Sequence, residues 1–316
     1  MINENYIPYG TDYLQENFNF HNIFEQGNDN EQNIDIYDDI DLSSKYYDPE
    51  TFCSEFKENK NLSVLSLNVQ SLSAKFSSLL DLISFWKQKG VIFDIICLQE
   101  TFNIPVPSLF SIPNYHDIIY KTRSNFAGGG VAIFVHSSLK FSILNEYSIF
   151  KEKIIESLFI EIEFYNKKKI ILGNVYRSPS QGLGEISTTD QMNIFLEHMQ
   201  GIIDSIGESN KKAVLVGDFN LNLLNYNSHN ITKEFANMLF SAGFLQLISN
   251  PTRVGSHNNS ISLIDHICSN DIRDQMLSGI ITTYLSDHFA TYHFIDLQIN
   301  ISPPQKNYFI KGIFRY

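Results

Sequence analysis

The chain has 316 residues, and 43% of them are apolar, which is enough to fill a substantial core. Its formal net charge of −12 originates in residues 1–60, which hold 14 acidic and 3 basic side chains, so the remainder is close to neutral. The sequence has no apolar run of membrane-spanning length, no signal-peptide pattern and no metal-binding cysteine spacing. These features predict a soluble, intracellular protein with no membrane partner.

Composition divides the chain into four segments. Residues 1–50 are acidic, rich in Asn and without apolar periodicity, so we expect a largely disordered extension. Residues 51–60 are expected to be a linker, residues 61–299 the folded domain, and residues 300–316 a C-terminal tail.

The predicted elements are strands interrupted by single helices. In chain order, apolar runs predict strands at residues 62–69, 93–98, 131–135, 158–164, 170–175, 213–218, 262–267 and 289–295. Apolar residues at helical spacing predict helices at residues 73–89, 190–206 and 232–240. Because strands outnumber helices and the helices occur singly between groups of strands, we expect an α/β (α+β) fold with two mixed β-sheets flanked by helices.

The apolar run that starts at residue 213 reaches Gly217 and then presents a carboxylate and a carboxamide. Asp218 and Asn220 have the same parity, so they share one face of a strand and can point into one pocket at its C-terminal end. Such strand ends commonly hold the functional sites of α/β proteins. An Asx turn after the strand would explain the same pair, so the stretch alone leaves both interpretations open.

Other apolar runs also end or begin at polar side chains. Glu100 and Tyr176 follow two of these runs, Asp265 lies within a third, and His288 precedes the last. Strand ends that carry hard-oxygen or imidazole groups, gathered from the whole chain, predict a single site.

These residues belong to motifs that occur in one order along the chain. The motifs are Asn68, Gln99-Glu100-Thr101, Tyr176-Arg177, Gly217-Asp218-Phe219-Asn220, Asp265 and Ser286-Asp287-His288. Their order resembles the endonuclease/exonuclease/phosphatase superfamily, which includes deoxyribonuclease I, apurinic/apyrimidinic endonucleases, inositol polyphosphate 5-phosphatases and neutral sphingomyelinases. The resemblance covers roughly residues 61–299 and implies a four-layer sandwich like that of deoxyribonuclease I.

Further stretches resemble the endonuclease domain of LINE-type (non-LTR) retrotransposons, namely residues 128–135, 175–179, 251–253 and 263–266. A common form of the second stretch is Tyr-Arg-Pro-Pro, from which Ser178 departs. The resemblance implies a Mg²⁺-dependent phosphodiesterase that nicks one strand of DNA and leaves a 3′-hydroxyl. Because the sequence holds no Tyr-x-Asp-Asp motif and only a short tail after residue 299, we expect a free-standing or truncated endonuclease domain without a reverse transcriptase. It is expected to be a monomer, and nuclear if it acts on chromosomal DNA.

Phosphodiester cleavage needs a hard cation, a positioned water and a group that steadies the leaving oxygen. We predict Glu100 as a ligand of Mg²⁺, for which Mn²⁺ can substitute, because a carboxylate that ends a buried strand suits this ion. Asn68 would assist the metal or hold the phosphate. Asp287 would contact the metal or the loop that carries His288.

Asp218 is predicted as the general base or as the group that orients the water, with Asn220 binding a phosphate oxygen. Tyr176 would donate a hydrogen bond to the phosphate or the scissile oxygen. His288 is assigned to the scissile phosphate, and Asp265 would accept from its other ring nitrogen and so fix its tautomer.

Basic residues next to the motif loops are candidates for contacts with DNA phosphates. We predict substrate contacts at Arg123, Arg177, Thr252 and Arg253. His266 follows Asp265 directly, so it points to the opposite strand face and is expected to be structural.

Two other functions stay open. The chain could be a superfamily phosphatase or phospholipid phosphodiesterase, of the inositol phosphatase or sphingomyelinase type. It could also be a catalytically retired transposon remnant that only binds nucleic acid, although all the principal motif residues are present.

Overall fold

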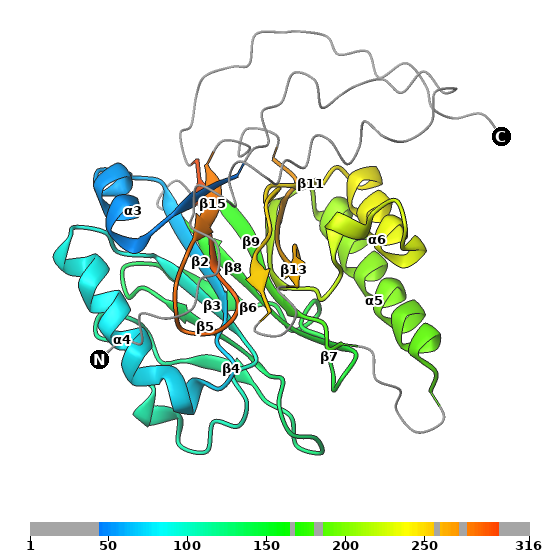
Figure 1. The fold of residues 1–316 in the computed structure, drawn as a ribbon, viewed down its shortest axis with the longest axis horizontal. Helices are drawn as coiled ribbons and strands as arrows, with labels where there is room; N and C mark the ends of the chain where they lie inside the picture. The colour runs from blue at the N-terminus through cyan, green and yellow to red at the C-terminus, as the bar shows by residue number, and fades with distance from the viewer. Residues whose placement is uncertain (1–43, 165–167, 180–185, 256–259, 272–276, 297–316) are drawn as a thin grey trace, which may run out of the picture.

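The computed structural model describes residues 44–164, 168–179, 186–255, 260–271 and 277–296. These residues form four layers: helices, a sheet, a second sheet and helices again. In Figure 1 the layers run from α3 and α4 on one side to α5 and α6 on the other. The predicted four-layer sandwich of two mixed sheets is therefore confirmed.

The first sheet has seven strands in the order β1-β15-β16-β2-β3-β5-β4. The strands are β1 (Lys45–Tyr47), β15 (Ser278–Ile281), β16 (Ala290–Ile295), β2 (Leu62–Asn68), β3 (Ile95–Gln99), β5 (Val131–Val135) and β4 (Ile119–Lys121). β1 is parallel to β15 and β2 is parallel to β3, whereas the other neighbours are antiparallel.

The second sheet has the order β11-β14-β10-β9-β8-β6, and β7 also pairs with β8. Its strands are β11 (Leu245–Gln246), β14 (Asp265–Ser269), β10 (Lys212–Asp218), β9 (Lys169–Tyr176), β8 (Ile155–Glu163), β6 (Lys140–Ile143) and β7 (Phe150–Lys151). Only β9 and β10 are parallel among these pairs. A separate two-stranded ribbon joins β12 (Arg253–Val254) to β13 (Ile261–Ser262).

The two sheets pack face to face around one apolar core. Val64 and Ile95 of the first sheet share this core with Leu172 and Val214 of the second. The alternate residues of the same strands are buried too, because they face the helices on the outside. Strands that are buried on both faces need apolar side chains at nearly every position, which explains the continuous apolar runs in the sequence.

Each sheet has helices on its outer face. The first sheet is covered by α3 (Pro49–Phe56) and α4 (Leu72–Gln88), and the second by α5 (Thr188–Ser209) and α6 (Asn230–Ser241). The hydroxyls of Ser71 and Ser187 cap α4 and α5 by accepting a hydrogen bond from the backbone three residues on. Two short 3₁₀ turns, η1 (Pro107–Leu109) and η2 (Leu223–Asn225), lie in loops. Within the described part of the chain, no helix combines the length and the apolar character that crossing a membrane requires.

The predicted helices and strands occur near their predicted positions, but the N-terminal boundary needs correction. β1 falls within the expected extension, and α3 runs from the end of the expected extension into the expected linker. β1 pairs with β15, and Phe52 of α3 is fully buried against the rings of Phe93 and Tyr292. The sequence prediction missed these elements because β15, the partner of β1, and Tyr292, a partner of α3, lie more than 200 residues away in the chain. Residues 1–43 and 300–316 fall outside the described residues.

Gly217, the last residue before Asp218, sits where the backbone allows no side chain. Its φ of +139° disfavours residues with a Cβ, and a Cβ built there would lie 1.9 Å from the carbonyl oxygen of Val175 on β9. A glycine is therefore required for β10 to approach β9 closely and bring Asp218 beside Tyr176.

We predict that Gly217→Ala destabilises the fold by about 1–3 kcal/mol, because the added methyl group collides with backbone that cannot move away. Gly201→Ala is the matched control, since a Cβ at Gly201 in α5 has no neighbour within 4 Å. It should stabilise by about 0.5–1 kcal/mol through helix propensity. Urea unfolding measures both, and equal effects of the two substitutions would contradict the close approach.

Candidate active site

The polar strand ends meet at one edge of the sandwich. Asn68 ends β2 and Glu100 follows the parallel strand β3, while Tyr176 and Asp218 end the parallel strands β9 and β10. Asp265 begins β14 and is the register partner of Asp218. Parallel strands end at the same edge, so two short parallel pairs, one in each sheet, bring these side chains together.

A chain of hydrogen bonds connects the two sheets through this edge. The Asn68 amide donates from Nδ2 to Glu100 Oε1 over 2.9 Å and to Asp218 Oδ2 over 2.8 Å. The Tyr176 hydroxyl donates to the same Glu100 oxygen over 3.1 Å. Asn68 and Asp218 are almost completely buried. One amide therefore sets the position of a carboxylate from each sheet.

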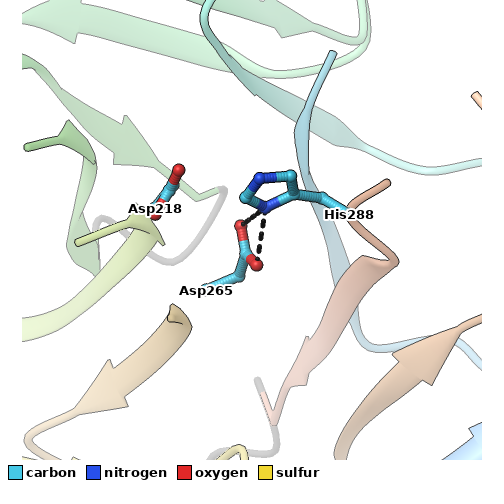
Figure 2. A group of neighbouring side chains, drawn as sticks. All are labelled: Asp218, Asp265 and His288. Atoms are coloured by element: carbon cyan, nitrogen blue, oxygen red, sulfur yellow. Dashed lines mark hydrogen bonds and ion pairs between the residues drawn. The ribbon is translucent and has the colours of Figure 1, made fainter. Parts of the chain in front are cut away.

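The second part of the site is a carboxylate and imidazole pair (Figure 2). His288 Nδ1 lies 3.0 Å and 2.9 Å from the two carboxylate oxygens of Asp265. Since a carboxylate only accepts, Nδ1 carries the proton, and this leaves Nε2 to act on a ligand. Ligand atoms of Asp218, Asp265 and His288 all lie within 4.8 Å of one another. The predicted pairing of Asp265 with His288 is present in the structure.

Burial and charge shift the pKa values of this group. Burial raises the pKa of Asp218 to about 7, and the negative charge of Asp265 adds to that effect. Burial lowers the pKa of His288, but the charge and hydrogen bond of Asp265, together with the charge of Asp218, outweigh it and raise the value to about 9. Near neutral pH, His288 is therefore protonated and Asp218 is close to its titration point.

Asn220 holds Asp218 in place. Its backbone N–H donates to Asp218 Oδ1 over 2.9 Å, which is the Asx turn that the sequence left open. Its Nδ2 donates to the carbonyl of Arg177 over 2.8 Å and to Asp218 Oδ2 over 3.2 Å. Because both amide hydrogens are used, the predicted contact of Asn220 with a phosphate oxygen is not supported, and the residue positions the carboxylate instead.

Two of the predicted substrate contacts are wrong. Arg177 is buried, and its guanidinium donates to the carbonyls of Phe219 and Asn220, each over 2.6 Å. It secures the loop after Asp218 and has almost no exposed surface. Thr252 is fully buried and donates its hydroxyl to Asp265 Oδ2 over 2.6 Å, so it orients the carboxylate behind His288.

Asp287 accepts hydrogen bonds through both of its carboxylate oxygens. Its Oδ2 accepts from Arg253 over 2.8 Å, and its Oδ1 accepts from Gln70 Nε2 over 2.5 Å. Oδ1 further lies 3.9 Å from His288 Nε2. Asp287 therefore lies on the His288 side of the site, engaged by two donors, and its predicted role as a metal ligand stays a prediction. Arg253 is partly exposed, so its predicted DNA contact stays a prediction.

Arg123 lies at the other side of the site, next to Tyr176. Its Nε forms an ion pair with Glu156 over 2.5 Å, and both side chains are almost fully buried. Its guanidinium carbon lies 5.9 Å from the centre of the Tyr176 ring. The sequence reasoning did not identify Glu156, since a glutamate near the start of an alternating strand has no distinguishing pattern. The predicted phosphate contact of Arg123 remains a prediction.

Gln99 and Asn174 form a buried polar contact between the sheets that the sequence reasoning also missed. Gln99 Nε2 donates to Asn174 Oδ1 over 2.7 Å, and Asn174 Nδ2 donates to the carbonyls of Leu98 and Ala132. The available signal was the single amide side chain inside the apolar run at residues 170–175. This contact fixes β9 against β3 close to the site, because Asn174 lies two residues before Tyr176 and Gln99 directly precedes Glu100.

His266 is structural, as predicted. Its Nε2 lies 2.9 Å from the carbonyl of Leu221, and its Nδ1 lies 2.9 Å from Gln246 Nε2. Burial lowers its pKa to about 4, so the ring is neutral near pH 7. It packs against the rings of Phe219 and Phe235 on the helix side of the sheet.

The carboxylate oxygen that is available at Glu100 suits a hard cation as its ligand. Glu100 is partly exposed and uses only Oε1 for hydrogen bonds, and no described residue donates to its Oε2. A free carboxylate oxygen at the mouth of the site suits an ion that keeps most of its water. The oxygens of Asp218 and Asp265, by contrast, are each engaged by a donor, which suits proton transfer better than a closed metal cage.

Residues 65–288 match the Endonuclease/Exonuclease/phosphatase family. The match spans more than half of the chain and includes the whole candidate site from Asn68 to His288, and the chain belongs to this family. A search of curated proteins found no match.

Solved structures show the same fold at low sequence identity. The endonuclease domain of TRAS1, a telomere-specific non-LTR retrotransposon, is 17% identical with a TM-score of 0.57, and the match covers 76% of this chain and all of that domain. The catalytic domain of Xenopus laevis APE2 is 18% identical with a TM-score of 0.54, covering 73% and 91%. An AP endonuclease from Archaeoglobus fulgidus is 15% identical with a TM-score of 0.53, covering 75% and 100%.

We predict that Arg177→Lys lowers the free energy of unfolding by about 1–3 kcal/mol, because a lysine cannot reproduce the bonds to two buried carbonyls. Arg253→Lys, at a partly exposed ion pair, should change it by less than about 0.5 kcal/mol. Thermal and urea unfolding without DNA test this. An Arg177→Lys variant of unchanged stability that binds DNA less well would restore the original prediction.

Proposed function

We propose that this protein is a metal-dependent DNA endonuclease that nicks one strand and leaves a 3′-hydroxyl. The observation that carries the proposal is the grouping of the Asp265 and His288 pair with Asp218 and, through the Asn68 amide, with Glu100. This grouping supplies a proton acceptor, a proton donor and a hard-cation ligand at one sheet edge. Phosphodiester hydrolysis needs these three components.

Glu100 would hold the cation, which we propose to be Mg²⁺ with Mn²⁺ able to substitute. A bound divalent cation neutralises the charge that develops on the phosphate. Asn68 and Tyr176 orient the Glu100 carboxylate by donating to Oε1, which leaves Oε2 to bind the cation. Burial and the nearby carboxylates raise the pKa of Tyr176 well above its usual range, which keeps its hydroxyl a donor.

Asp218 and His288 divide the proton chemistry. Asp218 accepts a proton from the attacking water, because its raised pKa lets it bind one near neutral pH. His288 keeps Nδ1 on Asp265 and directs Nε2 to a phosphate oxygen, where its positive charge stabilises the transition state. Thr252 and Asn220 act only through the two carboxylates that they position.

DNA is the proposed substrate because of the motifs shared with retrotransposon endonuclease domains. Similar structures include a retrotransposon endonuclease domain, an AP endonuclease and a 3′-5′ exonuclease. We further propose that the protein acts as a monomer and, on chromosomal DNA, in the nucleus. A phosphatase, a phospholipid phosphodiesterase and an inactive DNA-binding remnant are outcomes that the following experiment distinguishes.

We predict that the purified protein nicks supercoiled plasmid in the presence of Mg²⁺ or Mn²⁺ and not in EDTA. His288→Ala and Glu100→Gln should each lower the nicking rate by about 10²–10⁴-fold, because they remove the proton donor and the cation ligand. The control variants His198→Ala and Glu197→Gln change the same residue types on α5, outside the site, and should retain full activity.

The substrate is tested in parallel. A folded protein that hydrolyses inositol phosphates or sphingomyelin but leaves plasmid intact would show a superfamily phosphatase or phospholipid phosphodiesterase. DNA binding without any cleavage would indicate the retired remnant. Activity that survives both His288→Ala and Glu100→Gln would overturn the site assignment.

A further inference from the structure

A cavity of about 310 Å³ adjoins the candidate active site. Its lining includes Glu100 and Tyr176 of the candidate site, together with Arg123, Lys153 and Gln191. A liquid water molecule occupies roughly 30 Å³, so the cavity has space for about ten waters, or for a phosphate group with part of its sugar. A substrate bound at Glu100 would therefore extend into this cavity.

Two buried donors that border the cavity lack a hydrogen-bond partner. Arg123 uses Nε for Glu156 and Nη1 for the carbonyl of Ala127, but its Nη2 has no partner among the described residues. The same holds for Nε2 of Gln191, a residue that is only 3% exposed. Buried donors are nearly always paired, because an unpaired one loses its bonds to water without replacement. Two such donors at one cavity indicate that a ligand supplies the acceptors.

The position of Arg123 is fixed by the surrounding structure. A Cβ at Gly129 would lie 2.2 Å from Arg123 Nε, so the guanidinium packs directly on glycine backbone. The ring centre of Tyr176 lies 5.9 Å from the guanidinium carbon, and the ion pair with Glu156 holds Nε. The donor is therefore held in place before any ligand binds, as a binding site requires.

The chemistry of the lining selects an acceptor. The guanidinium of Arg123 and the ammonium of Lys153 can only donate, and Gln191 presents its unpaired N–H₂. Lys153 lines the cavity, and its Nζ lies 4.1 Å from the centre of the Phe126 ring. A phosphate group has only acceptor oxygens and matches this set, whereas a nucleobase presents donors as well.

We propose that this cavity binds the phosphate next to the cleaved phosphodiester on the same DNA strand. The cleaved phosphate lies at the Glu100 end, where a cation offsets the carboxylate, and its neighbour lies against Arg123, Gln191 and Lys153. This assignment rests on the proposed DNA endonuclease function and adds a second phosphate subsite to it.

The test uses a short duplex with one mapped nicking site and a neutral methylphosphonate in place of the phosphate on either side of that site. With wild-type protein, one of the two replacements should lower kcat/KM about tenfold, because a charged acceptor is lost. In Gln191→Leu and in Lys153→Met, the same replacement should have a smaller effect, since the contact is already weakened. Gln200→Leu and Lys151→Met are matched controls at exposed positions and should respond like wild type.

The outcomes separate the two proposals. Nicking of the unmodified duplex, with a methylphosphonate effect of equal size in wild type and in both variants, overturns the subsite and leaves the endonuclease function intact. A folded wild-type protein that does not nick the unmodified duplex overturns both. Lys153 is only partly buried, so Lys153→Met tests the subsite even where Gln191→Leu does not fold.

Discussion

The hydrogen bond from Asn68 to Asp218 joins the two sheets at the edge where the chemistry is proposed to occur. Its donor ends a strand of the first sheet and its acceptor ends a strand of the second, 150 residues later in the chain. The same amide nitrogen also donates to Glu100. Two carboxylates placed close together repel one another, and a shared amide between them offsets that repulsion while fixing their separation. The rest of the site is arranged around this contact.

A hydrogen bond between the two sheets requires that the strand ends of both sheets keep fixed positions relative to one another. Gly217 permits the close approach of β10 to β9, and Gln99 with Asn174 ties β9 to the first sheet. Arg177 secures the backbone that follows Asp218. None of these residues is assigned to the proton chemistry, yet each one limits where Asp218 can lie. The apolar core between the sheets supplies the rigidity, and this small set of polar contacts supplies the precision.

Much of the fold could be predicted from the sequence because strands buried on both faces produce continuous apolar runs. The grouping of Asn68, Glu100, Asp218, Asp265 and His288 could be predicted too, since polar residues at strand ends stand out against those runs. Contacts between residues that lie far apart in the sequence could not be predicted. Whether an arginine beside a motif loop faces solvent, like Arg253, or carbonyl oxygens, like Arg177, depends on loops that come together only in the folded chain. The same reason explains the error at Thr252 and the buried α3, which was expected to belong to the extension and the linker.

The central claim is that the Glu100 carboxylate and the His288 imidazole act on one phosphate in one step. The most direct test is the nicking rate of the double variant Glu100→Gln with His288→Ala, compared with the two single variants under single-turnover conditions. Groups that act together in one transition state give strongly non-additive losses. The account predicts that the double variant is about as slow as the slower single variant. Losses that multiply would contradict it, because they would show two groups that act independently.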